Sequence, residues 1–344
     1  MPNVPVTLAT SNNFWTRAIL DGDVTAEGID LNASVVMPPE KRHSQMKRGA
    51  FDAAEFSFST LIRSCVVGGG QAQRALPLWL NRGLRHKTII VRKGSRITQP
   101  SHLSGGRIAG LSYGGSTNIW ARQLLADDYG VDPKSVTWVV LEEEDDLDPS
   151  AGIRTEQVDG GLDNFAAFWS MLAKDEVDAV ISPGFNFFYA TFERFSDMVA
   201  RSQSSGRKGP AGPGSVPTEL SDAFESLIPE TATAADYTRR TGVYPLIHTI
   251  SIKAELAEQH PEASARLVKL FREAARRAPD YMPDGDRELL VKERELMGFD
   301  PYVQGWGDWQ ERTTATFVQS LVKQGLLPSV VGPDSFMVAG YREL

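Results

Sequence analysis

The sequence predicts an α/β fold with largely parallel sheets. Short β-prone runs alternate with helical patterns through the first half of the chain, and this alternation is typical of parallel sheets. From residue 243 onward the pattern changes to one strand followed mostly by helices. The 344 residues are enough for a large core and more than one domain.

The elements of the first half can be placed in order. "VPVTLAT" alternates apolar and small polar residues and predicts an opening strand, and "EGIDLNASVV" predicts a second. A helix, a turn at Gly49 and a short strand follow the two prolines. Further strands are expected in "LRHKTIIVRKG", which ends at Gly94, and in "RIAGL", "SVTWVVL" and "VDAVIS".

Helix boundaries carry recognisable signals. "STNIWARQLLADDYG" has an apolar stripe, can be capped by Ser116 or Thr117, and is closed by Gly130. "PEASARLVKLFREAARRA" starts with a proline and keeps an apolar face, and "ERTTATFVQSLVKQGLLP" predicts a final amphipathic helix. Two linkers are expected: an acidic, solvated loop in "EEEDDLDPSAG" and a Gly/Pro/Ser-rich insert at residues 201–221.

Composition excludes several classes of protein. The net charge of −8 argues against a general nucleic-acid binder, although a local basic site remains compatible with it. A single cysteine, Cys65, excludes an internal disulfide and a zinc site made of cysteines. No apolar stretch approaches membrane-spanning length, and the first residues lack a secretory signal pattern, so we expect no membrane partner and a cytoplasmic location.

Several stretches resemble one family over nearly the whole chain, from about Val6 to Leu327. "DGDVTAEGIDL" and "RGAFDAAEFSFSTLI" look like the opening of the type II periplasmic-binding-protein fold. "NRGLRHKTIIV", "LIHTISIK", "LADDYGVDPKSVTWVV" and the segment "DPYVQGWGDWQERTTATFVQSLVKQGLLP" resemble the 4,5-dihydroxyphthalate decarboxylase family. The stretch "TSNNFWTR" after the first strand departs from the family pattern.

The resemblance implies two α/β lobes that close on a ligand cleft. Lobe 1 would hold residues 1–90 and 247–344, and lobe 2 would hold residues 91–246. Ligands in such folds sit beyond the carboxyl ends of strands. Arg85, His86 and His248 would then lie near the crossovers between the lobes.

Decarboxylation of a hydroxylated benzoate needs an anion clamp and a proton donor to the ring carbon, and an electron-rich phenol serves as its own electron sink. We therefore expect a small aromatic carboxylate as ligand and no organic cofactor. Arg85 is the first clamp candidate, because guanidinium binds a carboxylate bidentately, and Arg82 and Arg17 are weaker ones. For each of them, a solvated strand-end arginine is the alternative.

Histidine titrates near neutral pH, so His86 and His248 are the proton-transfer candidates, although each is equally compatible with a hydrogen-bonded core role. Glu55 in "FDAAEFSFS" could orient a histidine or accept a phenol proton, or it could simply pair with an arginine. His43 looks like a surface or helix residue.

Other candidates would contact the substrate. Ser57 and Ser59 could donate to a carboxylate or a ring hydroxyl, and neither lies in a nucleophile-elbow pattern. "SYGGSTNIW" resembles an anion seat at a helix start, or is ordinary glycine punctuation; its candidates are Tyr113, Ser116, Thr117 and Trp120. A metal site from Glu55, His86 and His248 is conceivable, but the phenol electron sink makes a metal unnecessary, and none is predicted.

Two further functions stay open beside a decarboxylase. A solute-binding protein for an aromatic carboxylate would use the same fold to serve a transporter, and a cytoplasmic ligand sensor would use it without catalysis. A homo-oligomer is compatible with all three. The aromatic segment "DPYVQGWGDWQ" is expected either to cover the cleft or to mediate subunit packing.

Overall fold

A computed structural model of the chain describes residues 3–37, 39–68, 72–182 and 222–344. The insert predicted at 201–221 lies outside the described residues. The chain divides into two compact units. Unit 1 contains residues 1–82, 246–315 and 331–344, and unit 2 contains residues 83–245 and 316–330. The family resemblance instead placed 83–90 and 316–330 in the first lobe.

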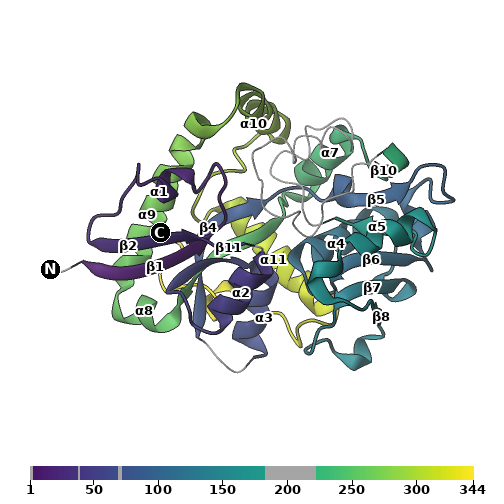
Figure 1. Cartoon of the computed structure of the whole chain (residues 1–344), viewed down its shortest axis with the longest axis horizontal. Helices are drawn as coiled ribbons and strands as arrows, with labels where there is room; N and C mark the ends of the chain where they lie inside the picture. Colours follow the sequence, from purple (N-terminus) through teal and green to yellow (C-terminus); the bar gives the residue numbers. More distant parts are fainter. Residues whose placement is uncertain (1–2, 38, 69–71, 183–221) are drawn as a thin grey trace. The chain divides into compact units, whose positions relative to one another are not determined.

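Unit 1 is built on a five-stranded sheet with the order β2-β1-β3-β11-β4. Its strands are β1 (Val4–Thr10), β2 (Ile29–Val35), β3 (Ala53–Ser57), β4 (Gln73–Arg82) and β11 (Leu246–Lys253). β1 pairs in parallel with β2 and β3, whereas β11 runs antiparallel to both β3 and β4. The late strand β11 therefore lies between β3 and β4 in a sheet made otherwise from the first 82 residues, as Figure 1 shows.

Unit 1 contains the two helices expected after the prolines and at Pro261, together with others that were not individually predicted. They are α1 (Arg17–Leu20), α2 (Pro39–Lys47), α3 (Phe58–Val66), α8 (Ala254–Gln259), α9 (Pro261–Arg277) and α10 (Asp284–Met297). The proline start of α9 is confirmed, since Pro261 stands in the first turn, where its missing N–H costs nothing. α2 and α3 both contact β3, and all five residues of that strand are buried.

Unit 2 contains a six-stranded sheet with the order β10-β5-β9-β6-β7-β8. Its strands are β5 (Ile89–Arg92), β6 (Arg107–Ser112), β7 (Thr137–Glu142), β8 (Arg154–Gln157), β9 (Ala179–Ile181) and β10 (Phe224–Ser226). β6 to β9 pair in parallel, and β5 runs antiparallel to its two neighbours. The mostly parallel α/β architecture predicted from the alternating pattern is confirmed.

The helices described in unit 2 are α4 (Ser116–Tyr129), α5 (Ala166–Ala173) and α7 (Thr231–Thr241). α4 ends at Gly130 with φ of 65°, so the predicted glycine stop is confirmed. Its N-cap, however, is Gly115 without a side-chain hydrogen bond, so the predicted capping by Ser116 or Thr117 is wrong. The final helix α11 (Asp308–Lys323) has residues in both units.

The predicted strand in "LRHKTIIVRKG" is too long. His86–Thr88 form a short 3₁₀ turn and only Ile89–Arg92 are strand, while the unpredicted strand β4 ends at Arg82. Arg82 and Arg85 therefore belong to different elements, and to different units, despite being three positions apart. None of the helices in the described part of the chain is long and apolar enough to cross a membrane.

Candidate active site

The candidate site is centred on Glu55, a carboxylate in the middle of the buried strand β3. Glu55 is only 3% exposed and its strand neighbours Ala54 and Phe56 are fully buried. A charge at such a position is costly unless it is paired and hydrogen-bonded.

The two carboxylate oxygens of Glu55 have different partners. Oε2 accepts from the backbone N–H of Ser11 at 3.0 Å and from its hydroxyl at 2.5 Å, and lies 3.3 Å from Nη2 of the Arg42 guanidinium. Oε1 lies 2.8 Å from Nδ1 of His248. One carboxylate thus joins the end of β1, helix α2 and strand β11.

These partners keep Glu55 ionised. Burial by itself would raise the pKa of Glu55, but the Arg42 guanidinium, His248 and the Ser11 hydrogen bond outweigh it and hold the pKa well below its ordinary value. At neutral pH the carboxylate is therefore a fixed negative charge and a hydrogen-bond acceptor.

His248 lies on β11 between β3 and β4, where the pairing is irregular. It is opposite Ser57 on one side and Asn81 on the other, and the register with β4 shifts on both sides of it. Such bulges re-aim side chains and are frequent beside active sites. The hydrogen bond to Glu55 fixes the tautomer with the proton on Nδ1, which leaves Nε2 to exchange a proton with a ligand, as in hydrolase triads.

Helix α2 supplies two further groups that the sequence did not single out as functional. Arg42 is fully buried, and its Nε also donates to the backbone oxygen of Glu55 at 2.9 Å. The His43 ring meets the His248 ring edge-on, with 5.3 Å between centroids. Burial, then the charges of His248 and Arg42, hold the pKa of His43 well below its ordinary value. His43 lies on helix α2, as one of the two expected placements had it, and its ring packs in this cluster.

The other candidates of unit 1 lie in varied surroundings. Arg82 is fully buried, with its guanidinium carbon 4.8 Å from the centroid of the Tyr302 ring and 5.4 Å from that of Trp15. Arg17 is half exposed and forms an ion pair with Asp21 at 2.6 Å.

Two serines close to Glu55 in sequence lie at the junction of β3 and α3. Ser57 caps α3 by accepting a hydrogen bond from the N–H of Thr60, and Ser59 is fully buried in the first turn of that helix. The cap gives Ser57 a structural role that is independent of any ligand.

Arg85 and His86 belong to unit 2, and both are 1% exposed. His86 meets the ring of Tyr237 edge-on at 5.5 Å, and neither of its ring nitrogens has a hydrogen-bond partner among the described residues. Burial, and secondarily the charge of Arg240, lower the pKa of His86 to about 3. His86 is therefore neutral at pH 7.

The glycine turn before α4 already has a carboxylate partner. The N–H of Gly114 donates to Oε1 of Glu144 at 2.6 Å, so the acidic run is not simply the solvated loop that was expected. Tyr113 is buried under Arg122 with 3.7 Å between the guanidinium carbon and the ring centroid, and Trp120 stacks on Phe317 at 4.9 Å. Ser116 and Thr117 are buried in the first turn of α4.

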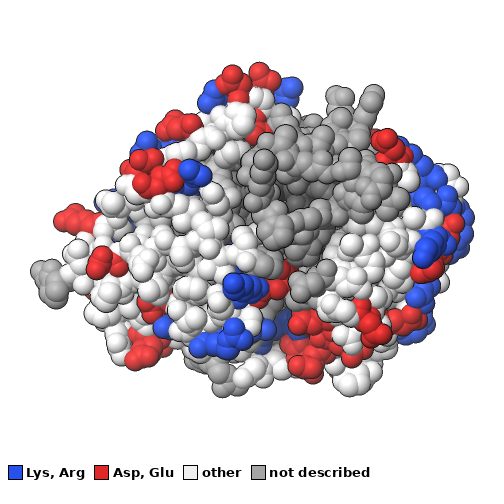
Figure 2. All heavy atoms as spheres, in the orientation of Figure 1, with Lys and Arg blue, Asp and Glu red and all other residues white. Residues whose placement is uncertain are grey.

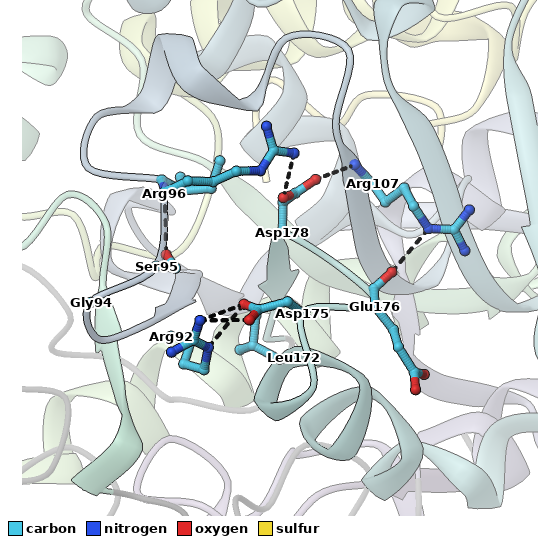
Figure 3. Close-up of a pocket in the computed structure, with 10 residues that line it drawn as sticks. Arg92, Gly94, Ser95, Arg96, Arg107, Leu172, Asp175, Glu176 and Asp178 are labelled. Atoms are coloured by element: carbon cyan, nitrogen blue, oxygen red, sulfur yellow. Dashed lines mark hydrogen bonds and ion pairs between the residues drawn. The ribbon is translucent and has the colours of Figure 1, made fainter.

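A pocket of about 350 Å³ lies elsewhere in unit 2 and contains none of the predicted site residues. Figure 3 shows that two of its arginines are held by acidic side chains: Arg92 by Asp175 and Arg96 by Asp178. These pairs neutralise the pocket internally, and pairs this exposed contribute little to stability. On the face drawn in Figure 2, basic and acidic side chains are likewise interspersed.

Among the described residues, no group of three or more His, Cys, Asp and Glu side chains is arranged to hold a metal ion. The chemistry that the geometry supports is proton transfer by a carboxylate–histidine pair, Glu55 with His248.

Comparison with solved structures identifies the fold. The chain shares the fold of the periplasmic aliphatic sulphonate binding protein SsuA of Escherichia coli, with a TM-score of 0.57 and 11% identity over the full length of both chains. A putative periplasmic sulfonate-binding protein of Methylobacillus flagellatus KT gives a TM-score of 0.56 at 12% identity, covering 98% of this chain and 92% of that one. The predicted periplasmic-binding-protein-like α/β fold is confirmed.

Sequence comparison finds relatives that are named decarboxylases. The chain is 26% identical to a 4,5-dihydroxyphthalate decarboxylase of Comamonas testosteroni over 320 residues, which cover 90% of this chain and 88% of the relative. It is 28% identical to a 4,5-dihydroxyphthalate decarboxylase of Pseudomonas putida over 196 residues, or 53% and 72% of the two chains. No family model matches. The resemblance to these decarboxylases that the sequence motifs indicated is confirmed.

Proposed function

We propose that the protein is a non-oxidative decarboxylase of a hydroxylated aromatic carboxylate such as 4,5-dihydroxyphthalate. The observation that carries the proposal is the buried Glu55–His248 pair, in which an ionised carboxylate holds Nδ1 of a histidine at 2.8 Å. The similarity to named decarboxylases along most of the chain supports the same activity.

The reaction balances without an oxidant or reductant. The protonated His248 gives its Nε2 proton to the ring carbon that bears the carboxylate, and the para hydroxyl group supplies the electron pair for the new C–H bond. The C–CO2 bond then breaks, its electron pair restores the aromatic ring, and CO2 leaves. Glu55 stabilises the imidazolium of His248 before the transfer. Afterwards, a proton from solvent protonates His248 again.

The test is a panel of hydroxylated benzoates and phthalates, assayed for CO2 release with the purified protein, with and without a chelator. The proposal expects turnover of at least one dihydroxylated acid, and equal rates in chelator. Binding without turnover, seen as a rise in melting temperature with no CO2 released, would overturn it in favour of a solute-binding protein.

Arg85 and His86 stay predictions as the carboxylate clamp and a second proton-transfer group. Replacing His86 by alanine is expected to lower turnover far more than stability, and replacing Arg85 is expected to raise KM above all. Full activity in both variants would remove them from the site.

A cytoplasmic location and a homo-oligomeric state also stay predictions, which cell fractionation and size-exclusion chromatography test.

A further inference from the structure

The loop after β1 is fixed around Ser11. The Ser11 hydroxyl, which donates to Glu55, itself accepts a hydrogen bond from Nδ2 of Asn13 at 3.0 Å. The backbone oxygen of Ser11 accepts from the hydroxyl of Thr16 at 2.6 Å. This is the stretch "TSNNFWTR", whose departure from the family pattern had no explanation in the sequence.

The contacts of Ser11 divide the two oxygens of Glu55. Both hydrogen bonds from Ser11 go to Oε2, and a second hydroxyl, from Thr10, donates to the same atom at 3.4 Å. Arg42 also approaches Oε2. Oε1 is thereby left to His248, and the carboxylate plane cannot rotate without breaking these contacts.

We propose that Ser11 is a positioning residue, which holds Glu55 ionised and oriented so that Oε1 engages Nδ1 of His248. This inference rests on the proposed proton-transfer role of the pair. It gives a role to the loop "TSNNFWTR", which departs from the family pattern. In this role the loop orients the Glu55 carboxylate that holds His248, rather than contacting the substrate through a charged or aromatic side chain.

The sheet provides a matched control. Thr7, four residues before Ser11 on β1, donates its hydroxyl and its N–H to Oδ2 of Asp52 at 2.7 and 2.9 Å. Thr7→Ala therefore removes a hydroxyl-to-carboxylate hydrogen bond between the same two segments without touching Glu55. Ser11→Thr retains a hydroxyl and serves as the conservative variant.

The first measurement needs no substrate. The side-chain carboxyl 13C resonance of Glu55, identified by its loss in Glu55→Gln, is followed against pH in the whole protein. Ser11→Ala is expected to raise the titration midpoint by about one pH unit, because a hydrogen bond to an ionised group is lost. Thr7→Ala is expected to leave it unchanged. An equal midpoint in Ser11→Ala and in the wild type overturns the proposal, even if the variant is less stable.

The second measurement is the pH profile of turnover for an acid from the panel. Ser11→Ala is expected to move the acid limb of kcat upward by the same shift and to lower kcat about tenfold with little change in KM, whereas Ser11→Thr restores most of the activity. An unmoved acid limb overturns the positioning role. If the 13C midpoint shifts but no acid on the panel is decarboxylated, the proposed function fails while the control of Glu55 by Ser11 stands.

Discussion

Two carboxylates at the junction of β1, β3 and β11, those of Asp52 and Glu55, have the same kinds of partner but differ in the chemistry that they support. The Asp52 carboxylate accepts a hydrogen bond from the Thr7 hydroxyl and forms an ion pair with Nζ of Lys253 at 2.9 Å. The Glu55 carboxylate accepts a hydrogen bond from the Ser11 hydroxyl, and its Oε1 lies 2.8 Å from Nδ1 of His248. In both, a carboxylate next to or within β3 bridges a hydroxyl near β1 and a basic group on β11.

Burial separates the two clusters. The side chains of Asp52 and Lys253 are 27% and 34% exposed, whereas those of Glu55 and His248 are 4% and 13% exposed. A half-exposed ion pair with lysine is a structural contact of small energy, since water competes for both charges. A buried carboxylate that holds a histidine is an arrangement that suits proton transfer to a ligand. Burial and the histidine partner, rather than the hydrogen-bond pattern, make one cluster a candidate site.

The largest effect is expected from the buried pair itself. His248→Ala or Glu55→Gln should lower kcat by roughly 10²- to 10⁴-fold, the range that general acid–base groups contribute. Lys253→Ala, the matched change in the exposed cluster, should leave kcat within about twofold. Steady-state CO2 release measures all three. Equal losses in His248→Ala and Lys253→Ala would mean that both changes act through the fold.

The next effect concerns stability. Arg42→Gln leaves the buried charge of Glu55 without its cation, and should lower the free energy of unfolding by about 3–5 kcal/mol. In urea unfolding, the Arg42→Gln variant should show this loss of stability as a lower midpoint concentration, with an unchanged dependence of the unfolding free energy on urea concentration. A loss below about 1 kcal/mol would show that Ser11 and His248 suffice to stabilise the carboxylate.

Acid should destabilise the protein from an unusually high pH. The pKa of His43 and the pKa of His86 lie below the ordinary histidine value of 6.5. Below pH 6.5 the unfolded chain therefore binds protons at these histidines that the folded chain does not bind. Because of this difference, the free energy of unfolding decreases as the pH drops through 6.5. Glu55, whose pKa is lowered from an ordinary 4.5, adds a second loss below that value. Thermal unfolding from pH 8 to pH 3 measures both. A His86→Phe variant should flatten the first part of the decline, and a slope equal to that of the wild type would contradict the assignment.

The smallest effect is expected from the exposed cluster. Burial raises the pKa of Asp52, but the hydrogen bonds from Thr7 and Lys253 outweigh it and lower the pKa. Because both side chains are partly exposed, Lys253→Ala should cost about 1 kcal/mol or less, and less again in high salt. Chemical unfolding at two ionic strengths checks this. A loss as large as that of Arg42→Gln would remove the contrast between the two clusters.

The sequence predicted part of the site and missed the residues behind it. Glu55 and His248 were named because of their chemical types, and the structure brings them together although they are 193 residues apart. Arg42 and Ser11 were missed, since an arginine on a polar helix and a serine in a turn-like loop look like ordinary surface residues. The only available signal was the buried carboxylate itself, because a glutamate inside an apolar strand must have a cation and hydrogen-bond donors nearby.

The sequence by itself determined the α/β architecture, through the alternation of strand and helix patterns, and local helix boundaries such as the stop at Gly130 and the start at Pro261. These features depend on backbone preferences that act within a few residues. Only the tertiary structure decided that β11 enters the sheet between β3 and β4, and that "LRHKTIIV" is a turn and a short strand. Pairing between distant segments is selected by burial and hydrogen bonding across the whole unit, and no local pattern records it. The same pairing brings Nδ1 of His248 within 2.8 Å of Oε1 of Glu55.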